Sequence, residues 1–131
     1  MKPEASLHLA KAQKLVATAR SLLKDGYPND AARDAYLAAY HAAQAYIVDH
    51  TGKAAKTHSG AHSQFAQLAS LEPSIPPDLC RFLAQAYTLK AIVDYEFGEG
   101  ADIPPARAAA SVETATTFIA CLTDLLDKGG E

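Results

Sequence analysis

The chain has 131 residues, of which 49% are apolar and 21% charged, with a net charge of −3. This length favours a single domain over residues 1–131, and the composition excludes disordered, fibrous and disulfide-rich classes. The N-terminus lacks the apolar core of a signal peptide and no apolar run reaches ~18 residues, so we expect a cytoplasmic protein that contacts no membrane. The two cysteines, Cys80 and Cys121, lie in apolar helical patterns and are expected to be reduced packing residues.

Glycine and proline clusters divide the chain into five predicted helices. The first is amphipathic, the second is rich in alanine, and the hydroxyl of Thr57 can cap the third. The connections are mostly short, which predicts an all-α fold, a five-helix antiparallel up-and-down bundle. The expected helices cover residues 3–24, 30–50, 57–70 and 78–97, and a last one runs from the Pro104-Pro105 pair to the Gly129-Gly130 pair.

Polar side chains on the second predicted helix form the first candidate site. Arg33, Tyr40 and Gln44 project from roughly one face, and Tyr36 and His41 flank that face on either side. An arginine, two phenols and an imidazole can together bind an anion or move a proton. The alternative is that the tyrosines fill space beside alanines while their hydroxyls reach water or a partner chain.

His58 and His62 are four residues apart, so both rings lie on one helical face and have the spacing of a metal-binding pair. Structural zinc needs about four ligands and catalytic zinc about three, and no Glu-x-x-His pair accompanies these histidines. Capping and solvation explain them adequately. We therefore expect no metal and no cofactor.

Tyr87, Lys90 and Asp94 share a face of the fourth predicted helix, and Tyr95 follows directly. The simpler interpretation is an ion pair between Lys90 and Asp94, four residues apart. Packed against the second helix, the same residues would instead complete a polar cleft with Arg33 and Tyr40. The chain has no phosphate-binding glycine loop, no Gly-x-Ser-x-Gly and no Cys-His nucleophile pattern, so conventional hydrolase and nucleoside-triphosphatase mechanisms have no support.

Three blocks of sequence resemble the HEPN domain family, the higher eukaryotes and prokaryotes nucleotide-binding domain. They are residues 35–45 (AYLAAYHAAQA), 56–60 (KTHSG) and 90–95 (KAIVDY), and the resemblance covers nearly the whole chain. It implies an antiparallel helical bundle, commonly a homodimer, that works beside a minimal nucleotidyltransferase in prokaryotic toxin–antitoxin pairs. Many such proteins are metal-independent ribonucleases that carry an arginine followed, after four to six residues, by a histidine.

The nearest such pair in this chain is Arg33 and His41, which seven residues separate, so that their directions differ by about 80° on an ideal helix. In a ribonuclease of this kind the histidine acts as general base on a ribose 2′-hydroxyl, and the arginine stabilises charge on the phosphate.

Two functions follow from the residues and the resemblance together. The first is a binding module that holds a nucleotidyltransferase partner, a nucleotide or RNA, with a second copy of the chain completing a homodimer. The second is a ribonuclease toxin with His41 or His58 as base and Arg33 as phosphate clamp. The residues expected to contact the nucleotide or partner are Tyr36, Tyr40, Lys56, Lys90, Asp94 and Tyr95.

Overall fold

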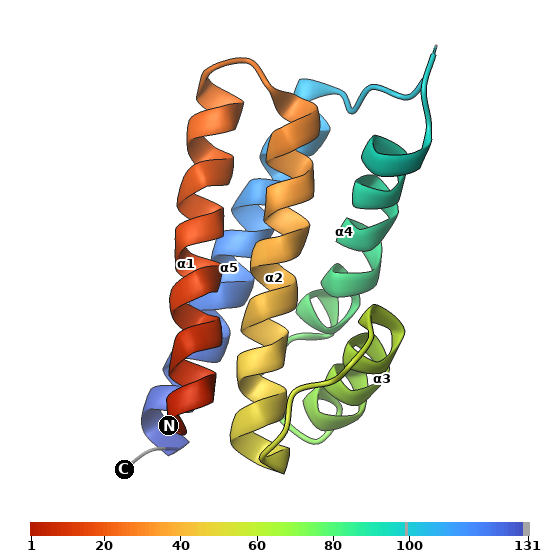
Figure 1. Cartoon of the computed structure of the whole chain (residues 1–131). Coiled ribbons are helices and arrows are strands. Elements are labelled where there is room, and N and C mark those ends of the chain that lie inside the picture. The colour runs from red at the N-terminus through yellow and green to blue at the C-terminus, as the bar shows by residue number, and fades with distance from the viewer. Residues whose placement is uncertain (99, 130–131) are drawn as a thin grey trace.

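A computed structural model describes residues 1–98 and 100–129 of the chain, and within them all regular structure is α-helical. In Figure 1, α1, α2, α4 and α5 alternate in direction along the bundle, and the short α3 lies beside the lower end of α2. The prediction of a five-helix antiparallel all-α bundle is therefore confirmed. The helices are α1 (Pro3–Lys24), α2 (Pro28–Thr51), α3 (His58–Ala69), α4 (Pro77–Tyr95) and α5 (Pro105–Gly129).

Proline opens every helix except α3. A proline in the first turn loses nothing by lacking an N–H, and its fixed φ suits the helix. The helix α3 is capped as predicted, because the Gly60 N–H donates to Thr57 Oγ1 at 2.9 Å. The predicted starts of α2 and α4, at Asp30 and Asp78, were one or two residues late because the preceding prolines were assigned to turns.

The helix ends follow the backbone conformations of a few residues. Gly52 ends α2 in the left-handed region, with φ 85°, and its N–H donates to the Val48 carbonyl at 2.7 Å. The helix α4 ends at Tyr95, two residues before the predicted end at Phe97, because Glu96 is already extended. The remaining predicted breaks include Glu99 and Gly130, which lie outside the described residues.

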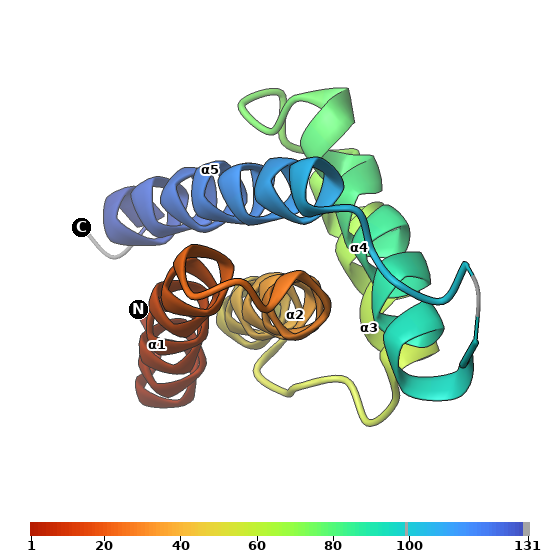
Figure 2. The same cartoon turned by 90° about the horizontal axis from the view of Figure 1, so that it is seen from above.

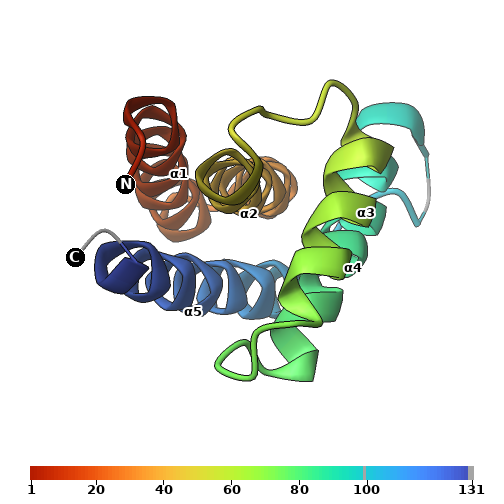
Figure 3. The same ribbon diagram turned by 90° about the horizontal axis from the view of Figure 1, so that it is seen from below.

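The alanine-rich α2 is the central helix of the bundle. It contacts all four of the other helices, and Figure 2 shows it between α1 and α4 with α5 alongside. Small side chains let neighbouring backbones approach closely, so α2 can be packed on several sides at once. Viewed from below, α3 and α4 cover the side of α2 that faces away from α1 (Figure 3). The fully buried alanines of α2 are Ala31, Ala32, Ala35, Ala38, Ala39, Ala42, Ala43 and Ala45.

Among the described residues, α5 is one helix that is long and apolar enough to cross a membrane. Its apolar stripe is buried in this bundle, where Phe118 contacts Phe65 and Phe82 with ring centroids 5.3 and 6.0 Å apart. The core helix of a soluble protein meets the same criterion of length and composition. Cys80 and Cys121 are half-buried and carry free thiols, as predicted.

Candidate functional site

A buried phenol lies between two histidines where α2 faces α3. The Tyr36 hydroxyl is 2.6 Å from Nδ1 of His58 and 3.0 Å from Nε2 of His62, and Tyr36 is fully buried. The two histidines share one face of α3, as their spacing predicted. Their common partner is a phenol oxygen, and among the described residues no group of three histidine, cysteine or carboxylate side chains is arranged to hold a metal ion.

The single proton of this hydroxyl imposes opposite roles on the two rings. Tyr36 can donate to one histidine only, so it accepts an N–H from the other. A proton that arrives at one ring can therefore leave from the other, with the hydroxyl reversing its direction between them. The arrangement is suited to general acid–base chemistry that needs no metal.

The Tyr36 phenol and the imidazoles of His58 and His62 are uncharged at neutral pH. Burial is the main cause that lowers the pKa of His58, and the Lys90 ammonium adds to it. Burial likewise lowers the pKa of His62, with a further contribution from His58. For Tyr36, burial raises the pKa of the phenol well above its usual range.

Stacked aromatic rings extend the site towards α4. The Tyr40 and His58 rings stack with centroids 4.4 Å apart, and Tyr87 of α4 meets the edges of Tyr36 and His62 at 5.2 and 5.3 Å. Such contacts hold each ring in one orientation. We refer to these five residues as the histidine–tyrosine cluster. From the sequence, Tyr87 was expected beside Lys90 in a cleft against the second helix, but its contact with His62 of α3 was not expected, because that contact depends on how three helices pack.

Gln44 fixes the segment that leads into α3. Its buried amide donates to the Ala55 carbonyl and accepts the Ala55 N–H, both at 2.9 Å, and Nε2 also donates to the Tyr40 hydroxyl at 3.0 Å. These two hydrogen bonds satisfy the N–H and the carbonyl of Ala55, as a neighbouring backbone would in regular secondary structure. Gln44 therefore positions His58 through Ala55 and Tyr40, a role that the sequence analysis did not assign to it.

A charged group lies beside the histidine–tyrosine cluster. Asp94 accepts from Arg33 Nε at 3.0 Å and from Lys90 Nζ at 2.8 Å, so α2 and α4 meet at this carboxylate. The bond with Lys90, followed by that with Arg33, lowers the pKa of Asp94, and the same bond raises the pKa of Lys90. Both the predicted ion pair and the predicted approach of Arg33 to this part of α4 are confirmed.

Two cations and one carboxylate leave this group with a net positive charge. Lys90 Nζ lies 5.7 Å from the centroid of Tyr87 and 5.6 Å from that of Tyr95. Tyr95 is 71% exposed, so its ring is accessible to a ligand. We call Arg33, Lys90, Asp94 and Tyr95 the cationic cluster. Through Tyr87 it joins the histidine–tyrosine cluster in one continuous face on α2, α3 and α4.

The structure does not bring His41 and Lys56 into this face. His41 turns towards α1, where it stacks on His8, and it borders the cluster through a T-shaped contact with the Tyr40 ring. The angular offset between Arg33 and His41 explains this, since α2 meets α4 on one side and α1 on another. Lys56 is exposed on the loop before α3 and lines a separate surface pocket.

The five helices, the alanine-rich α2 and the histidine, tyrosine and cation face define a small all-α module with one polar binding surface. The sequence model of the HEPN domain matches residues 5–128, nearly the whole chain, and the chain belongs to the HEPN domain family. This family comprises helical nucleotide-binding and ribonuclease-type modules. A comparison with curated proteins gives no match.

Proposed function

We propose that this chain is a nucleotide- or RNA-binding HEPN module and that the face formed by its two clusters is the binding surface. The observation that carries the proposal is the cationic cluster, in which Asp94 holds Arg33 and Lys90 side by side next to the exposed ring of Tyr95. A phosphate group takes charge-assisted hydrogen bonds from the two cations. A base stacks on Tyr95, as bases do on aromatic side chains in single-stranded nucleic-acid sites.

The positive charge of the cationic cluster allows a phosphate to bind to a chain that is acidic as a whole. The net charge is −3, and the cationic cluster offers the positive potential that the average lacks. Because the neighbouring histidines are neutral, the phosphate contact depends on Arg33 and Lys90. Affinity is then set by two cations and by stacking, and it should fall as salt is raised.

Binding of AMP and of a short oligouridylate at low salt, followed by isothermal titration calorimetry, tests the proposal. We expect Arg33→Ala and Lys90→Ala to weaken binding by roughly tenfold each, the scale of a lost charge-assisted hydrogen bond. Arg81→Ala is the matched control, because it removes the same charge from an exposed position of α4. Equal binding by all four proteins would overturn the proposal.

The proposed protein partner is a minimal nucleotidyltransferase in a two-component, toxin–antitoxin-type system, and the proposed assembly of the chain itself is a homodimer. Membership of the HEPN family supports both, and the exposed rings of Tyr95 and Phe97 offer apolar contacts. Co-purification with a nucleotidyltransferase encoded beside the gene tests the first. Light scattering tests the second, since a dimer has twice the 13.9 kDa mass of the chain.

The alternative function is a metal-independent ribonuclease, and the geometry of His58 favours it. Its Nδ1 is bonded to Tyr36, while its Nε2 makes no hydrogen bond to the described residues. His58 takes the proton of a ribose 2′-hydroxyl, whose oxygen bonds to the adjacent phosphorus as the bond to the 5′-oxygen breaks, and the departing 5′-oxygen takes a proton from water. Tyr36 relays the proton towards His62, and Arg33 or Lys90 holds the phosphate.

RNA cleavage in the presence of a chelator separates the two functions. The ribonuclease requires cleavage by the unchanged protein, its loss in His58→Ala and its survival in His41→Ala, because His41 lies on the α1 side. Helicity measured by circular dichroism confirms that the variants fold. If the unchanged protein cleaves nothing while it binds RNA, the binding module remains the function of this face.

A further inference from the structure

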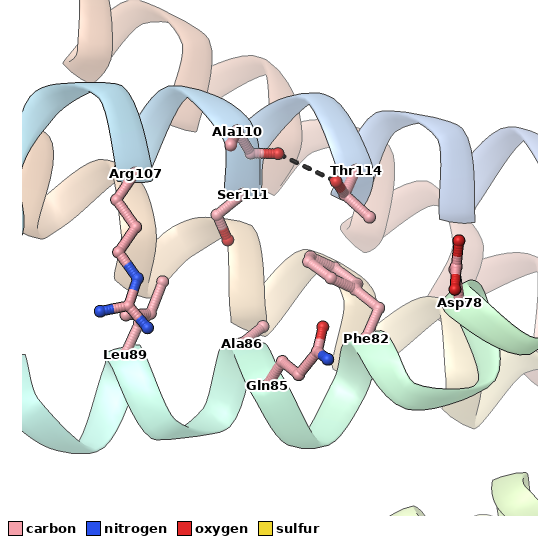
Figure 4. Close-up of a pocket in the computed structure, with 9 residues that line it drawn as sticks. All are labelled: Asp78, Phe82, Gln85, Ala86, Leu89, Arg107, Ala110, Ser111 and Thr114. Atoms are coloured by element: carbon pink, nitrogen blue, oxygen red, sulfur yellow. Dashed lines mark hydrogen bonds between the residues drawn. The ribbon is translucent and has the colours of Figure 1, made fainter.

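A second cleft lies between α4 and α5, apart from the face described above. It has a volume of about 430 Å³, within the usual range for sites of small molecules. Figure 4 shows Phe82, Ala86 and Leu89 of α4 on one side, with Arg107 and Ser111 of α5 opposite them. The cleft exists because alanine and serine side chains are too small to fill the space between these two helices.

Ser111 is the polar group at the centre of this cleft. The residue is 94% buried, and its hydroxyl has no hydrogen-bond partner within the described part of the chain. Every threonine of α5 behaves differently: each hydroxyl donates to the carbonyl four residues earlier, as Thr114 does to Ala110 at 3.0 Å. The Ser111 hydroxyl points instead towards α4 (Figure 4). An unpaired buried hydroxyl is destabilising, so a bound partner would remove that cost.

Arg107 supplies the charge of the cleft. It lies one turn before Ser111 on the same face of α5, so both side chains can reach one group. Within the described residues Arg107 makes no ion pair, whereas Asp78, at the other end of the cleft, is bonded to Arg81 at 2.7 Å. Arg107 is also in the first turn of α5, where the helix dipole adds positive potential.

We propose that the α4–α5 cleft binds a small organic carboxylate. Its carboxylate accepts hydrogen bonds from the Arg107 guanidinium and the Ser111 hydroxyl, and its apolar body packs on Phe82 and Leu89. One unpaired cation beside an apolar wall matches a single negative charge on an apolar molecule. A phosphate dianion would need more donors than this cleft provides. This site is additional to the nucleotide-binding face and does not depend on it.

Titration of the ¹⁵N-labelled protein with benzoate and with hexanoate, followed by NMR, tests the proposal. We expect millimolar binding, with the largest shifts in the amides of Leu89 and Ser111. The neutral analogues benzamide and hexanamide should bind roughly tenfold more weakly, and Arg107→Gln should abolish that difference. Arg20→Gln is the matched control, since Arg20 bonds to Thr116 outside the cleft.

Ser111→Ala gives a second, independent readout. If the unpaired Ser111 hydroxyl bonds the ligand, the variant should bind benzoate roughly fivefold more weakly. Without ligand, the variant should melt at a higher temperature than the unchanged protein. The proposal is overturned if neither carboxylate shifts the cleft amides, or if Arg107→Gln and Ser111→Ala bind them as the unchanged protein does. AMP binding at the other face can be measured on the same samples, so failure at one site is distinguishable from failure at the other.

Discussion

His8 and His41 stack across the interface between α1 and α2, with their Nδ1 atoms 3.1 Å apart. One of these nitrogens must carry a proton and the other must accept it. Two protonated rings at this distance would repel each other. Burial is the main cause that lowers the pKa of both residues, for His41 to about 4. The packing of α1 on α2 therefore requires at least one neutral imidazole.

The first prediction is that the protein loses stability in acid. In the unfolded chain a histidine has a pKa of about 6.5, so below that pH the unfolded state binds more protons than the folded state. The stability from neutral His41 is fully present above about pH 6.5 and is lost as the pH falls towards its folded pKa of about 4. His8, His58 and His62 act in the same direction. Urea denaturation at several pH values measures this slope.

A pair of variants isolates the contribution of His41. His41→Gln should flatten the dependence of the unfolding free energy on pH, by up to about 1.4 kcal/mol per pH unit for one proton. His50→Gln makes the same chemical change at an exposed position and serves as the control. If both variants keep the slope of the unchanged protein, neutral His41 does not contribute to it.

The second prediction concerns the hydroxyl between the two histidines of α3. Tyr36→Phe removes it and leaves the partly buried ring nitrogens of His58 and His62 without this partner. We expect the unfolding free energy to fall by about 1–3 kcal/mol. Tyr40→Phe is the comparison, because the Tyr40 hydroxyl accepts one hydrogen bond from Gln44 and its loss should cost less. A Tyr36→Phe protein as stable as the unchanged one would contradict the prediction.

The third prediction tests the hydrogen bonds by which Gln44 holds the loop before α3. Gln44→Glu keeps the shape of the side chain, but a carboxylate cannot donate to the Ala55 carbonyl or to the Tyr40 hydroxyl. A buried charge would also replace a neutral amide. We expect a loss of at least about 2 kcal/mol at neutral pH, partly recovered in acid as the carboxyl is protonated. Thermal melts of the variant and of the unchanged protein at neutral and mildly acidic pH measure both effects, because the unchanged protein itself loses stability in acid. A difference in melting temperature between the two proteins that is the same at both pH values would argue against this role of Gln44.

The fourth prediction is a gain of binding. Asp94→Asn removes the negative charge that Arg33 and Lys90 share, so both cations become available to a phosphate. We expect AMP and oligouridylate to bind several-fold more tightly, with a steeper dependence on salt. The stability change should stay within about 1 kcal/mol, as is typical of exposed ion pairs. Weaker binding of both ligands by Asp94→Asn would contradict this prediction and show that the ligand needs the carboxylate, either as a direct contact or to hold Arg33 and Lys90 side by side.

The fold was predictable because its signals are local. Prolines and glycines mark the ends of the helices, and the alanine content of residues 30–50 identified the central helix. Boundary errors arose where a proline belongs equally well to a turn or to the first turn of a helix, as at Pro28 and Pro77. Whether such a proline is the last residue of the turn or the first of the helix depends on the backbone dihedral angles of the residues that follow it, and residue propensities do not specify these angles.

The site was predictable only in part, because most of its contacts join different helices. Spacing placed His58 with His62 and Lys90 with Asp94, since four residues always bring side chains to one helical face. The sequence predicted a cleft in which Arg33 approaches Asp94. It did not predict that the Tyr36 hydroxyl lies between the two histidines. His41 shows the reverse case: it is near Arg33 in sequence, and the packing of α1 holds it on another side of α2.

The contact of α2 with every other helix has a thermodynamic consequence. No pair of helices can separate from the bundle without exposing part of α2, so the chain should unfold as one cooperative unit. A ligand that binds only the folded state then raises the melting temperature of the entire domain wherever it binds. A phosphate ligand at the α2–α4 face and a carboxylate in the α4–α5 cleft would reinforce the same folded state, so their stabilising effects should add.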